Sequence, residues 1–380
     1  MTGSRATPNG QELLVIGAGA IGRGFLPWCF QGSRLVFVDS NPAIVGPMRD
    51  RKRYTTYRAR DGGLDELLVP VAAAYLPSDF RTDDHPETAA VFVCVGPRNA
   101  VTAASLAIGL ECPIVLCEND PAMVGTVKAV TGLADVCFAV PDVITSNTAP
   151  PHLLARDPLS VVTEDGVLFV DEAVGPLLGE VTALSALELL DTQWTAKLFL
   201  HNTPHCVAAY LGALAGVMYV HEAMAIPEVE TIVRGSMKEM LDSLKLRWEI
   251  PHPFLEWYAE KELARFRNPL LFDPISRVAR EPLRKLESDG RLIGAAEICL
   301  ASGFIPQNLL SGIAAALLFA DDADADRHLA FMRQALPPAT FISHILGLRS
   351  GEALELILRE QLPRILPRLE TLRGSAKDPA

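Results

Sequence analysis

The sequence has 380 residues, a length that fits two domains or one large α/β domain with a second lobe. Hydrophobic residues make up 49% of the chain and charged residues 21%, which excludes disorder and coiled coil as the main architecture. The formal net charge of −12 repels nucleic-acid phosphates and anionic membrane surfaces, so neither is expected as a partner.

The first half alternates short apolar runs with helix-length segments, as in a parallel sheet with crossover helices. Near-continuous apolar runs are typical of strands that helices cover on both faces. The expected strands are Leu13–Gly17, Arg34–Asp39, Ala90–Gly96, Pro113–Glu118 and Val136–Val140. A hairpin is expected over Ser160–Asp171, with its turn at Asp165-Gly166. We therefore predict an α/β fold whose N-terminal domain, residues 1–190, is a Rossmann-type doubly wound sheet.

From about Asp191 the chain changes to long amphipathic segments, and residues 191–380 are predicted to form a mainly α-helical substrate-binding domain. The expected helices are Ala196–Gly216, Pro227–Lys245, Leu255–Arg267, Ile293–Gly303, Asn308–Phe319, Asp326–Ala335 and Glu352–Leu362. The last is expected to end at Pro363. The acidic run Asp321–Arg327 is interpreted as a solvated loop, because it lacks the glycine and the glutamate of a calcium loop.

Two stretches, Leu198–His221 and Ile298–Ala320, contain no Asp, Glu, Lys or Arg and are long enough to span a membrane. Both contain proline and several polar side chains, so we interpret them as buried helices of the folded protein and not as membrane spans. The seven cysteines form no Cys-x-x-Cys, and no apolar signal core precedes the first expected strand. Reduced thiols and a cytoplasmic location are therefore expected.

The first strand runs into the glycine pattern Gly17-Ala18-Gly19-Ala20-Ile21-Gly22. Gly17 would permit the turn, Gly19 the approach of a pyrophosphate, and Gly22 the close packing of helix on strand. Asp39 ends the next strand, where a carboxylate accepts hydrogen bonds from ribose hydroxyls and repels a 2′-phosphate, which favours NAD over NADP. The alternatives are that Asp39 caps a turn at Asn41-Pro42, and that the basic run Arg49–Arg53 neutralises such a phosphate instead of forming a solvated face.

Continued by Arg23-Gly24-Phe25, this loop resembles the opening of the polyol-specific long-chain dehydrogenases, the mannitol dehydrogenase family. Further segments resemble the family in the same order: Val95-Gly96-Pro97, Cys117-Glu118-Asn119, Lys197–His205, Ala209–Gly212, Arg265–Pro269 and Pro282–Leu286. The resemblance implies an NAD-dependent, metal-independent oxidation of a secondary alcohol on an open-chain polyol, or the reverse reduction of a ketose. It also implies a site in the cleft between the two domains, with Val95 at the cofactor.

The spacing Lys-x4-Asn-x2-His, formed by Lys197, Asn202 and His205, is the most specific of these matches. Around an α-helix the three positions fall at roughly 0°, 140° and 80°, which is one continuous sector. Alcohol oxidation needs a base, and burial could bring a lysine pKa from about 10.4 toward roughly 7–8. Lys197 is therefore the expected base; the alternative is a surface lysine that extends its amine into solvent.

Asn202 is expected to donate an N–H to the developing alkoxide, and the resemblance gives Asn119 a partner role from the Rossmann side. His205 is expected to hold a neighbouring substrate hydroxyl, the alternative being a core histidine. His201 and His205 also have the i, i+4 spacing of a zinc pair. No metal is expected, because Asn202 stands where zinc peptidases carry glutamate, and no third ligand is evident.

Arg284, Lys285 and Arg291 concentrate positive charge in an acidic chain and are expected to bind a substrate phosphate; the alternative is a salt-bridged helix surface. Asp142 follows the last Rossmann strand, where relatives carry Val-Asp-Arg, and is expected to tune the lysine or touch substrate.

The leading prediction is an NAD-dependent polyol-phosphate dehydrogenase that interconverts mannitol 1-phosphate and fructose 6-phosphate. Two alternatives remain open: a hexonate or unphosphorylated polyol dehydrogenase, since a carboxylate could occupy the basic pocket, and a non-catalytic NAD-binding sensor. The expected partner is a small-molecule polyol or sugar phosphate, and the protein is expected to be a monomer or a homodimer.

Overall fold

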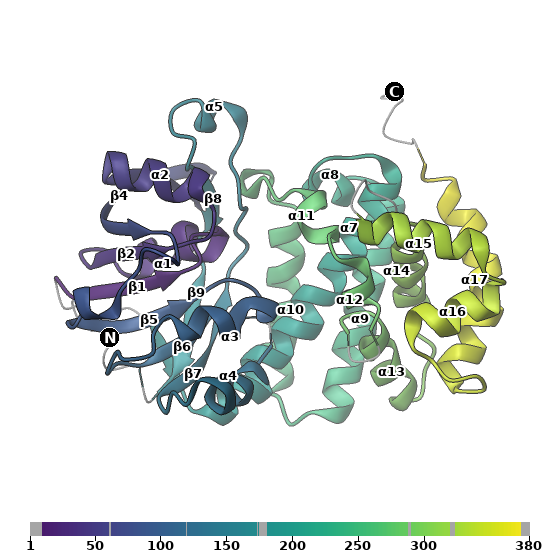
Figure 1. The fold of residues 1–380 in the computed structure, drawn as a ribbon. Helices are drawn as coiled ribbons and strands as arrows, with labels where there is room; N and C mark the ends of the chain where they lie inside the picture. Colours follow the sequence, from purple (N-terminus) through teal and green to yellow (C-terminus); the bar gives the residue numbers. More distant parts are fainter. Residues whose placement is uncertain are drawn as a thin grey trace. The chain divides into compact units, whose positions relative to one another are not determined.

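The structure is a computed structural model that describes residues 10–60, 62–118, 120–172, 174, 181–287, 290–319 and 324–373. The chain divides into two compact units, Met1–Trp194 and Thr195–Ala380 (Figure 1). The first contains the β-sheet and the second is helical. Among the described residues, none of the helices combines the length and the apolar character that crossing a membrane requires.

The described strands of the first unit form a ten-stranded sheet with the order β10-β9-β7-β6-β5-β1-β2-β4-β3-β8. Its centre is parallel and consists of β1 (Glu12–Ile16), β2 (Arg34–Val38), β5 (Thr88–Val93), β6 (Ile114–Leu116) and β7 (Val136–Asp142). The chain reverses its order at β1, between β2 and β5, which is where ligands bind in open α/β sheets. The α/β prediction is confirmed, with strand ends that differ by a few residues.

Helices cover this sheet on both faces, because alternate side chains of each strand point to opposite sides. Leu13 and Val15 face one core, which also contains Phe25 and Met48. Leu14 and Ile16 face the other core. The helices concerned are η1 (Ala20–Phe25), α1 (Leu26–Cys29) and α2 (Pro42–Arg51) in the first case, and α3 (Pro97–Ser105) and α4 (Met123–Thr131) in the second.

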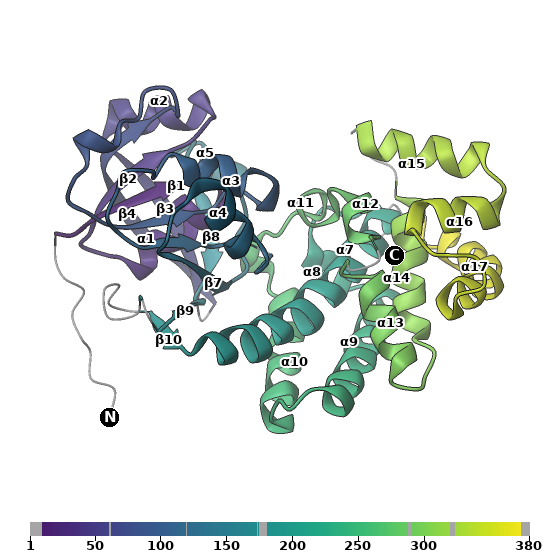
Figure 2. The ribbon, with the colours of Figure 1, turned by 60° about the horizontal axis from the view of Figure 1, so that its bottom comes forward.

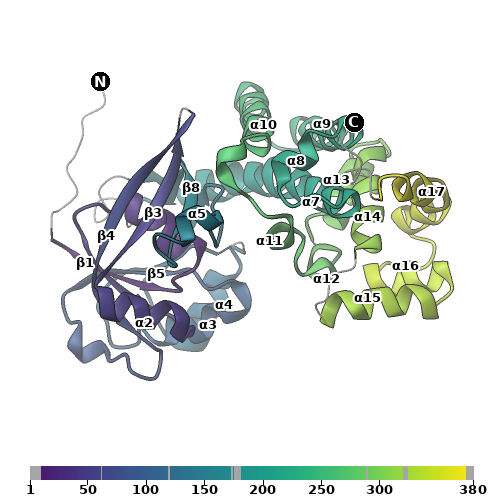
Figure 3. The same ribbon diagram turned by 90° about the horizontal axis from the view of Figure 1, so that it is seen from above.

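Between β2 and the edge strand β8, the sheet contains a long antiparallel pair that was not predicted from the sequence. The strands are β3 (Arg53–Arg60) and β4 (Gly63–Tyr75), which lie side by side in Figure 3. β4 joins the pair to β2, and η2 (Thr82–Asp84) follows it. In the basic run Arg49–Arg53, Arg49 and Arg51 belong to the last turn of α2 and form ion pairs with Asp79 and Asp157.

The predicted hairpin over Ser160–Asp171 is wrong. β8 (Val161–Glu164) pairs in parallel with β3, whereas β9 (Val167–Asp171) pairs antiparallel with β7 at the other side of the sheet. Asp165 binds Arg58 and Arg60 instead of closing a tight turn. A Cβ on Gly166 would lie 2.7 Å from the carbonyl oxygen of Asp142, so the glycine permits close packing here. The remaining elements of this unit are α5 (Pro151–Leu154), β10 (Thr182–Leu184) and η3 (Glu188–Trp194).

The second unit is built around α7 (Thr203–Ala215), which continues η4 (Lys197–Asn202). Nearly every residue of α7 is buried, because α9 (Pro227–Arg247), α11 (Ile275–Ala279) and α14 (Gln307–Leu318) pack around it (Figure 2). The other elements are α8 (Val220–Met224), α10 (His252–Phe266), η5 (Pro269–Leu271), α12 (Pro282–Lys285), α13 (Ile293–Ala301), α15 (Asp324–Ala335), α16 (Pro338–Leu346) and α17 (Ala353–Glu370). The first charge-free stretch is largely buried in η4 and α7, as expected; in the second, α14 is buried, whereas the end of α13 and the turn before α14 are partly exposed.

Two local predictions for this unit are wrong. Pro363 does not end the last helix, which continues through Pro367 to Glu370. Burial of Leu358, Leu362 and Leu369 along one face offsets the hydrogen bond that each proline removes. The acidic run was interpreted as a loop, yet it is helical from Asp324 onward; residues 320–323 lie outside the described part of the chain.

Candidate active site

The glycine loop begins where β1 ends, and two of its glycines are required by their surroundings. Gly17 has φ +99°, and a Cβ there would lie 2.5 Å from the carbonyl oxygen of Cys94 and 2.8 Å from Val95. A Cβ on Gly22 would lie 2.0 Å from the carbonyl oxygen of Gly17. A Cβ on Gly19 would meet nothing within 4 Å, so this side of the loop is open. The packing therefore brings the predicted cofactor residues Gly17 and Val95 together.

The helix after the loop starts as a π-helix and not as an α-helix. η1 contains Ala20, Ile21 and Gly22, and its wider winding is closed by the N–H of Leu26, which donates to the carbonyl of Ile21 five residues earlier. Gly19 is the residue that precedes its first turn. Single π-helical turns are rare in proteins, and those that do occur are often found at functional sites.

Asp39 braces the same loop from the end of β2. Its Oδ2 accepts the N–H of Ala18 at 2.7 Å, and its Oδ1 accepts the N–H of Asn41 at 2.8 Å. The carboxylate therefore does cap the turn at Asn41, which was the alternative reading of this residue. Each carboxylate oxygen accepts more than one hydrogen bond, so these contacts leave capacity for ribose hydroxyls.

Arg23 was not predicted as a functional residue, yet it ties the loop to two other segments. Its guanidinium is buried and donates to the carbonyls of Ala18 at 2.5 Å, Leu159 at 3.0 Å and Asn147 at 3.0 Å. Burial lowers the pKa of this guanidinium. The cue in the sequence was a lone arginine inside an otherwise apolar helix start, a position that costs free energy unless every donor is satisfied.

Glu118 lies at the end of β6 and holds the loop that carries Val95. Its Oε1 accepts the N–H of Val95 at 2.7 Å and the N–H of Gly96 at 3.0 Å. The side chain is 4% exposed, and burial raises its pKa to about 7 even though these two hydrogen bonds act in the opposite direction. The next residue, Asn119, lies outside the described residues. Asp142, at the end of β7, is buried.

In the second unit, Lys197, Asn202 and His205 are all buried, with 7%, 6% and 5% exposure. Lys197 and Asn202 belong to the π-helical η4, in which the N–H of Thr203 donates to the carbonyl of Leu198. The regular α-helical angles used for the prediction are therefore wrong across this stretch. Pro204 gives a physical reason, because its ring lacks an N–H and clashes with the carbonyl four residues earlier, and a wider turn relieves both.

Asn202 carries a hydrogen-bond donor that nothing in the described part of the chain satisfies. Its Nδ2 is buried and has no hydrogen-bond partner. A buried amide without a partner costs on the order of 1–3 kcal/mol, so such a group calls for an explanation. A ligand oxygen would supply the acceptor.

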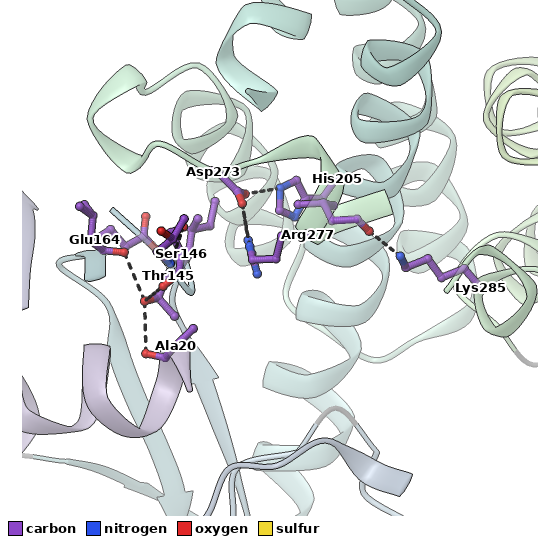
Figure 4. Close-up of polar contacts among 12 residues, drawn as sticks. Ala20, Thr145, Ser146, Glu164, His205, Asp273, Arg277 and Lys285 are labelled. Carbon is purple, nitrogen blue, oxygen red and sulfur yellow. Dashed lines mark hydrogen bonds and ion pairs between the residues drawn. The ribbon is translucent and has the colours of Figure 1, made fainter. Parts of the chain in front are cut away.

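His205 is held by a carboxylate and an arginine (Figure 4). Its Nε2 lies 2.8 Å from Oδ2 of Asp273, whose other oxygen accepts two hydrogen bonds from Arg277 at 2.9 and 2.5 Å. Burial acts to raise the pKa of Asp273, but Arg277 and His205 outweigh it and lower this pKa to about 2. Burial also lowers the pKa of His205 to about 4, so the ring is neutral near pH 7.

One helical turn earlier, His201 makes a similar arrangement. Its Nδ1 lies 2.5 Å from Oε2 of Glu262, and Arg265 binds the other oxygen of this carboxylate. The His201 and His205 rings lie 5.0 Å apart, each committed to its own carboxylate. No group of three potential metal ligands occurs among the described residues.

The residues of the basic cluster, Arg284, Lys285 and Arg291, differ in burial and in their partners. Arg284 pairs with Glu281 at 3.0 Å, as in the salt-bridge alternative. Lys285 is buried and donates to the carbonyls of Val278 and Arg280, and burial lowers its pKa to about 8. Burial lowers the pKa of Arg280, and the nearby charges of Arg277, Arg284 and Arg291 lower it further. Arg280 was missed, although its charge belongs to the same cluster.

The parallel sheet and its glycine loop define the class of Rossmann-type dinucleotide-binding proteins. Residues 190–332 match the family described as the mannitol dehydrogenase C-terminal domain. The chain is 31% identical to mannitol-1-phosphate 5-dehydrogenase of Brevibacillus brevis, with 92% of this chain and 97% of that protein aligned. It is 30% identical to the enzyme of the same name from Bacillus subtilis, with 92% and 99% aligned.

The fold is similar to that of Pseudomonas fluorescens mannitol 2-dehydrogenase, solved as a ternary complex with NAD and D-mannitol, at 17% identity and a TM-score of 0.71. This similarity covers 98% of this chain and 92% of that one. The chain belongs to the mannitol dehydrogenase family.

Proposed function

We propose that this protein is an NAD-dependent oxidoreductase that interconverts a polyol phosphate and a ketose phosphate, with mannitol 1-phosphate and fructose 6-phosphate as the pair. The observation that carries the proposal is the near-complete alignment with two enzymes named mannitol-1-phosphate 5-dehydrogenase. In this proposal, residues 1–190 form the NAD-binding domain and residues 191–380 form the substrate-binding domain. A cytoplasmic location and a monomeric or homodimeric state complete the proposal.

The residues at the carboxyl ends of β1, β2 and β5 fit a dinucleotide. The proposed cofactor residues are Gly17, Gly19, Ala20, Ile21, Gly22, Asp39 and Val95. The open side of the loop at Gly19 and the remaining acceptor capacity of Asp39 support this fit. The Asp39 carboxylate would repel a 2′-phosphate, which favours NAD over NADP. When bound, NAD takes up or returns the hydride.

On the substrate side, Lys197 is the proposed base that takes the hydroxyl proton. Asn202 would donate its Nδ2–H to the oxygen as negative charge develops, which would satisfy the unpartnered buried amide. Asn119 is the proposed second amide donor. His205 would hold the neighbouring hydroxyl, and the burial of Lys197 and His205 supports a water-poor environment for both.

The proposed phosphate site comprises Arg284, Lys285 and Arg291. Arg280 adds a further positive charge to this cluster: burial lowers its pKa most, and the nearby charges of Arg277, Arg284 and Arg291 lower it further, which supports a site for an anion. Lys285 would contribute chiefly through its charge, since its ammonium also donates to two main-chain carbonyls. Asp142 is proposed to contact substrate or to tune the base.

The test is a substrate panel followed at the absorbance of NADH. Purified protein with NADH is offered fructose, fructose 6-phosphate, tagaturonate and fructuronate at equal concentrations. The proposal expects the highest kcat/KM for fructose 6-phosphate. Preference for a sugar acid would assign the alternative hexonate dehydrogenase activity, preference for fructose the unphosphorylated polyol, and no turnover with any ketose the NAD-binding sensor.

A further inference from the structure

The imidazole of His205 is fixed on several sides. Its Nε2 lies 2.8 Å from Oδ2 of Asp273, and the ring stacks on Phe266 with a centroid separation of 4.9 Å and an interplanar angle of 9°. Arg277 binds the other carboxylate oxygen of Asp273 from the next turn of chain, at i+4. Both His205 and Asp273 are buried. The ring therefore has little freedom to rotate or flip.

The same contacts decide where the single proton of the neutral ring lies. An ionised carboxylate only accepts hydrogen bonds, so Nε2 must donate to it and must carry the proton. Arg277 keeps the carboxylate ionised, because two of its N–H groups bind Oδ1. Nδ1 is then left with a lone pair and without a proton.

We propose that Asp273 and Arg277 are positioning residues that hold His205 as the Nε2–H tautomer, so that Nδ1 accepts a hydrogen bond from a substrate hydroxyl. This inference rests on the proposed role of His205 in substrate binding. Its consequence is a directional requirement: the substrate group beside His205 must be a donor. A hydroxyl satisfies Nδ1, whereas a carbonyl oxygen, a fluorine or a hydrogen at that carbon does not.

The first experiment reads the tautomer without turnover. Protein labelled with ¹⁵N at histidine is measured by NMR at pH 7, with the His205 signals assigned by their loss in His205→Gln. The expected spectrum has a protonated Nε2 and an unprotonated Nδ1. A protonated Nδ1 overturns the proposal, and this result does not depend on whether the substrate has been identified.

The second experiment changes the carboxylate to its amide. In Asp273→Asn the side chain can donate to Nε2, so the carboxylate no longer fixes the proton there. We expect the KM for the ketose phosphate to rise at least tenfold while the affinity for NADH stays within twofold, and a signal from the Nδ1–H tautomer to emerge. An unchanged KM overturns the proposal. If this variant fails to fold, Arg277→Met keeps the carboxylate but removes its anchor, and the same shift in KM is expected.

His201 and Glu262 offer a matched control one helical turn away. Glu262→Gln changes the same kind of buried histidine–carboxylate contact at a ring with no proposed substrate role. We expect this variant to lower the melting temperature and to leave the KM for the ketose phosphate within twofold. An equal rise in KM for both variants would mean general loosening of α7 and would overturn the proposal. Failure of the wild-type enzyme to reduce any ketose would instead reject the proposed function, whatever the tautomer.

Discussion

Two buried carboxylates, one in each unit, respond in opposite ways to the same degree of burial. Glu118 and Asp273 are each 4% exposed. The pKa of Glu118 is raised to about 7, and that of Asp273 is lowered to about 2. Glu118 is bound by two neutral main-chain N–H groups, whereas Asp273 is bound by the guanidinium of Arg277 and the ring of His205. A cation beside the carboxylate, and not burial, thus decides the charge at neutral pH.

The difference separates a group that can take up a proton near neutral pH from one that cannot. Glu118 changes its charge within the range of an ordinary assay, and it does so under the loop that carries Val95. Asp273 stays ionised, which is what a fixed partner for His205 requires. A substitution that removes the cation beside Asp273 should therefore raise the pKa of this carboxyl group, as burial does for Glu118.

The largest effect is expected at the buried amine of Lys197. Lys197→Met removes the proposed base while leaving an apolar side chain of similar length. General acid–base groups contribute about 10²- to 10⁴-fold, so we expect kcat to fall by about a thousandfold. Steady-state rates with fructose 6-phosphate measure this loss, and fluorescence titration with NADH serves as the control. Equal losses of NADH affinity and of turnover would indicate a structural lysine.

Removal of the cation beside Asp273 is the next largest change. Arg277→Met should make Asp273 resemble Glu118, a buried carboxylate without a guanidinium. Breaking a buried ion pair costs about 3–5 kcal/mol of stability. Because Arg277 is partly exposed, we expect the free energy of unfolding to fall by about 3 kcal/mol. Urea denaturation at pH 7 measures it. Exposed Arg234→Met, which breaks a surface pair with Glu230, is the control and should cost less than about 1 kcal/mol.

At Glu118 we expect a substitution to increase the stability of the protein at alkaline pH, whereas Arg277→Met decreases it. Its folded-state pKa lies above its ordinary value of 4.5, so folding favours the protonated form. The associated stability is fully present below about pH 4.5 and is lost as pH rises through about 7, by about 3 kcal/mol in total. Glu118→Gln cannot ionise and keeps an oxygen for both N–H groups. We expect it to be more stable than the wild type at pH 8 and similar at pH 5, by paired urea melts; parallel pH profiles would contradict this.

The smallest effect is expected in the exposed part of the basic cluster. Arg284→Gln removes one proposed phosphate contact and the ion pair with Glu281. We expect about a tenfold rise in the KM for fructose 6-phosphate, little change for fructose and little change in stability. A similar rise for both sugars would show that Arg284 does not distinguish a phosphate.

The parts of the fold that follow from local pattern were predictable. The apolar runs gave the central strands, and the change of texture near Asp191 marked the start of the helical half. The pair β3–β4 was missed because β3 carries three arginines among few apolar residues and because Pro70 stands inside β4, where a proline argues against a strand. The hairpin prediction failed because Asp165-Gly166 is a valid turn signal whose strands prefer partners elsewhere in the sheet.

The same limit applies to the site. Gly17, Gly22 and Asp39 lie within one βαβ segment, so their spacing carries the information. Asp273 lies 68 residues after His205, and only the packing of α11 against α7 brings them together. A local cue did exist, since Asp273 and Arg277 are spaced for a helical ion pair, but it does not reveal which ring the acid binds.

The guanidinium of Arg23 has a consequence for how quickly and how tightly a dinucleotide is captured. Because three carbonyls from separate segments converge on it, the glycine loop is held in place by the chain's own contacts, without a ligand. Little backbone entropy remains to be lost on association, so affinity should be governed by the ligand's own contacts. Substitution of Arg23 should accordingly slow capture and make it strongly temperature-dependent.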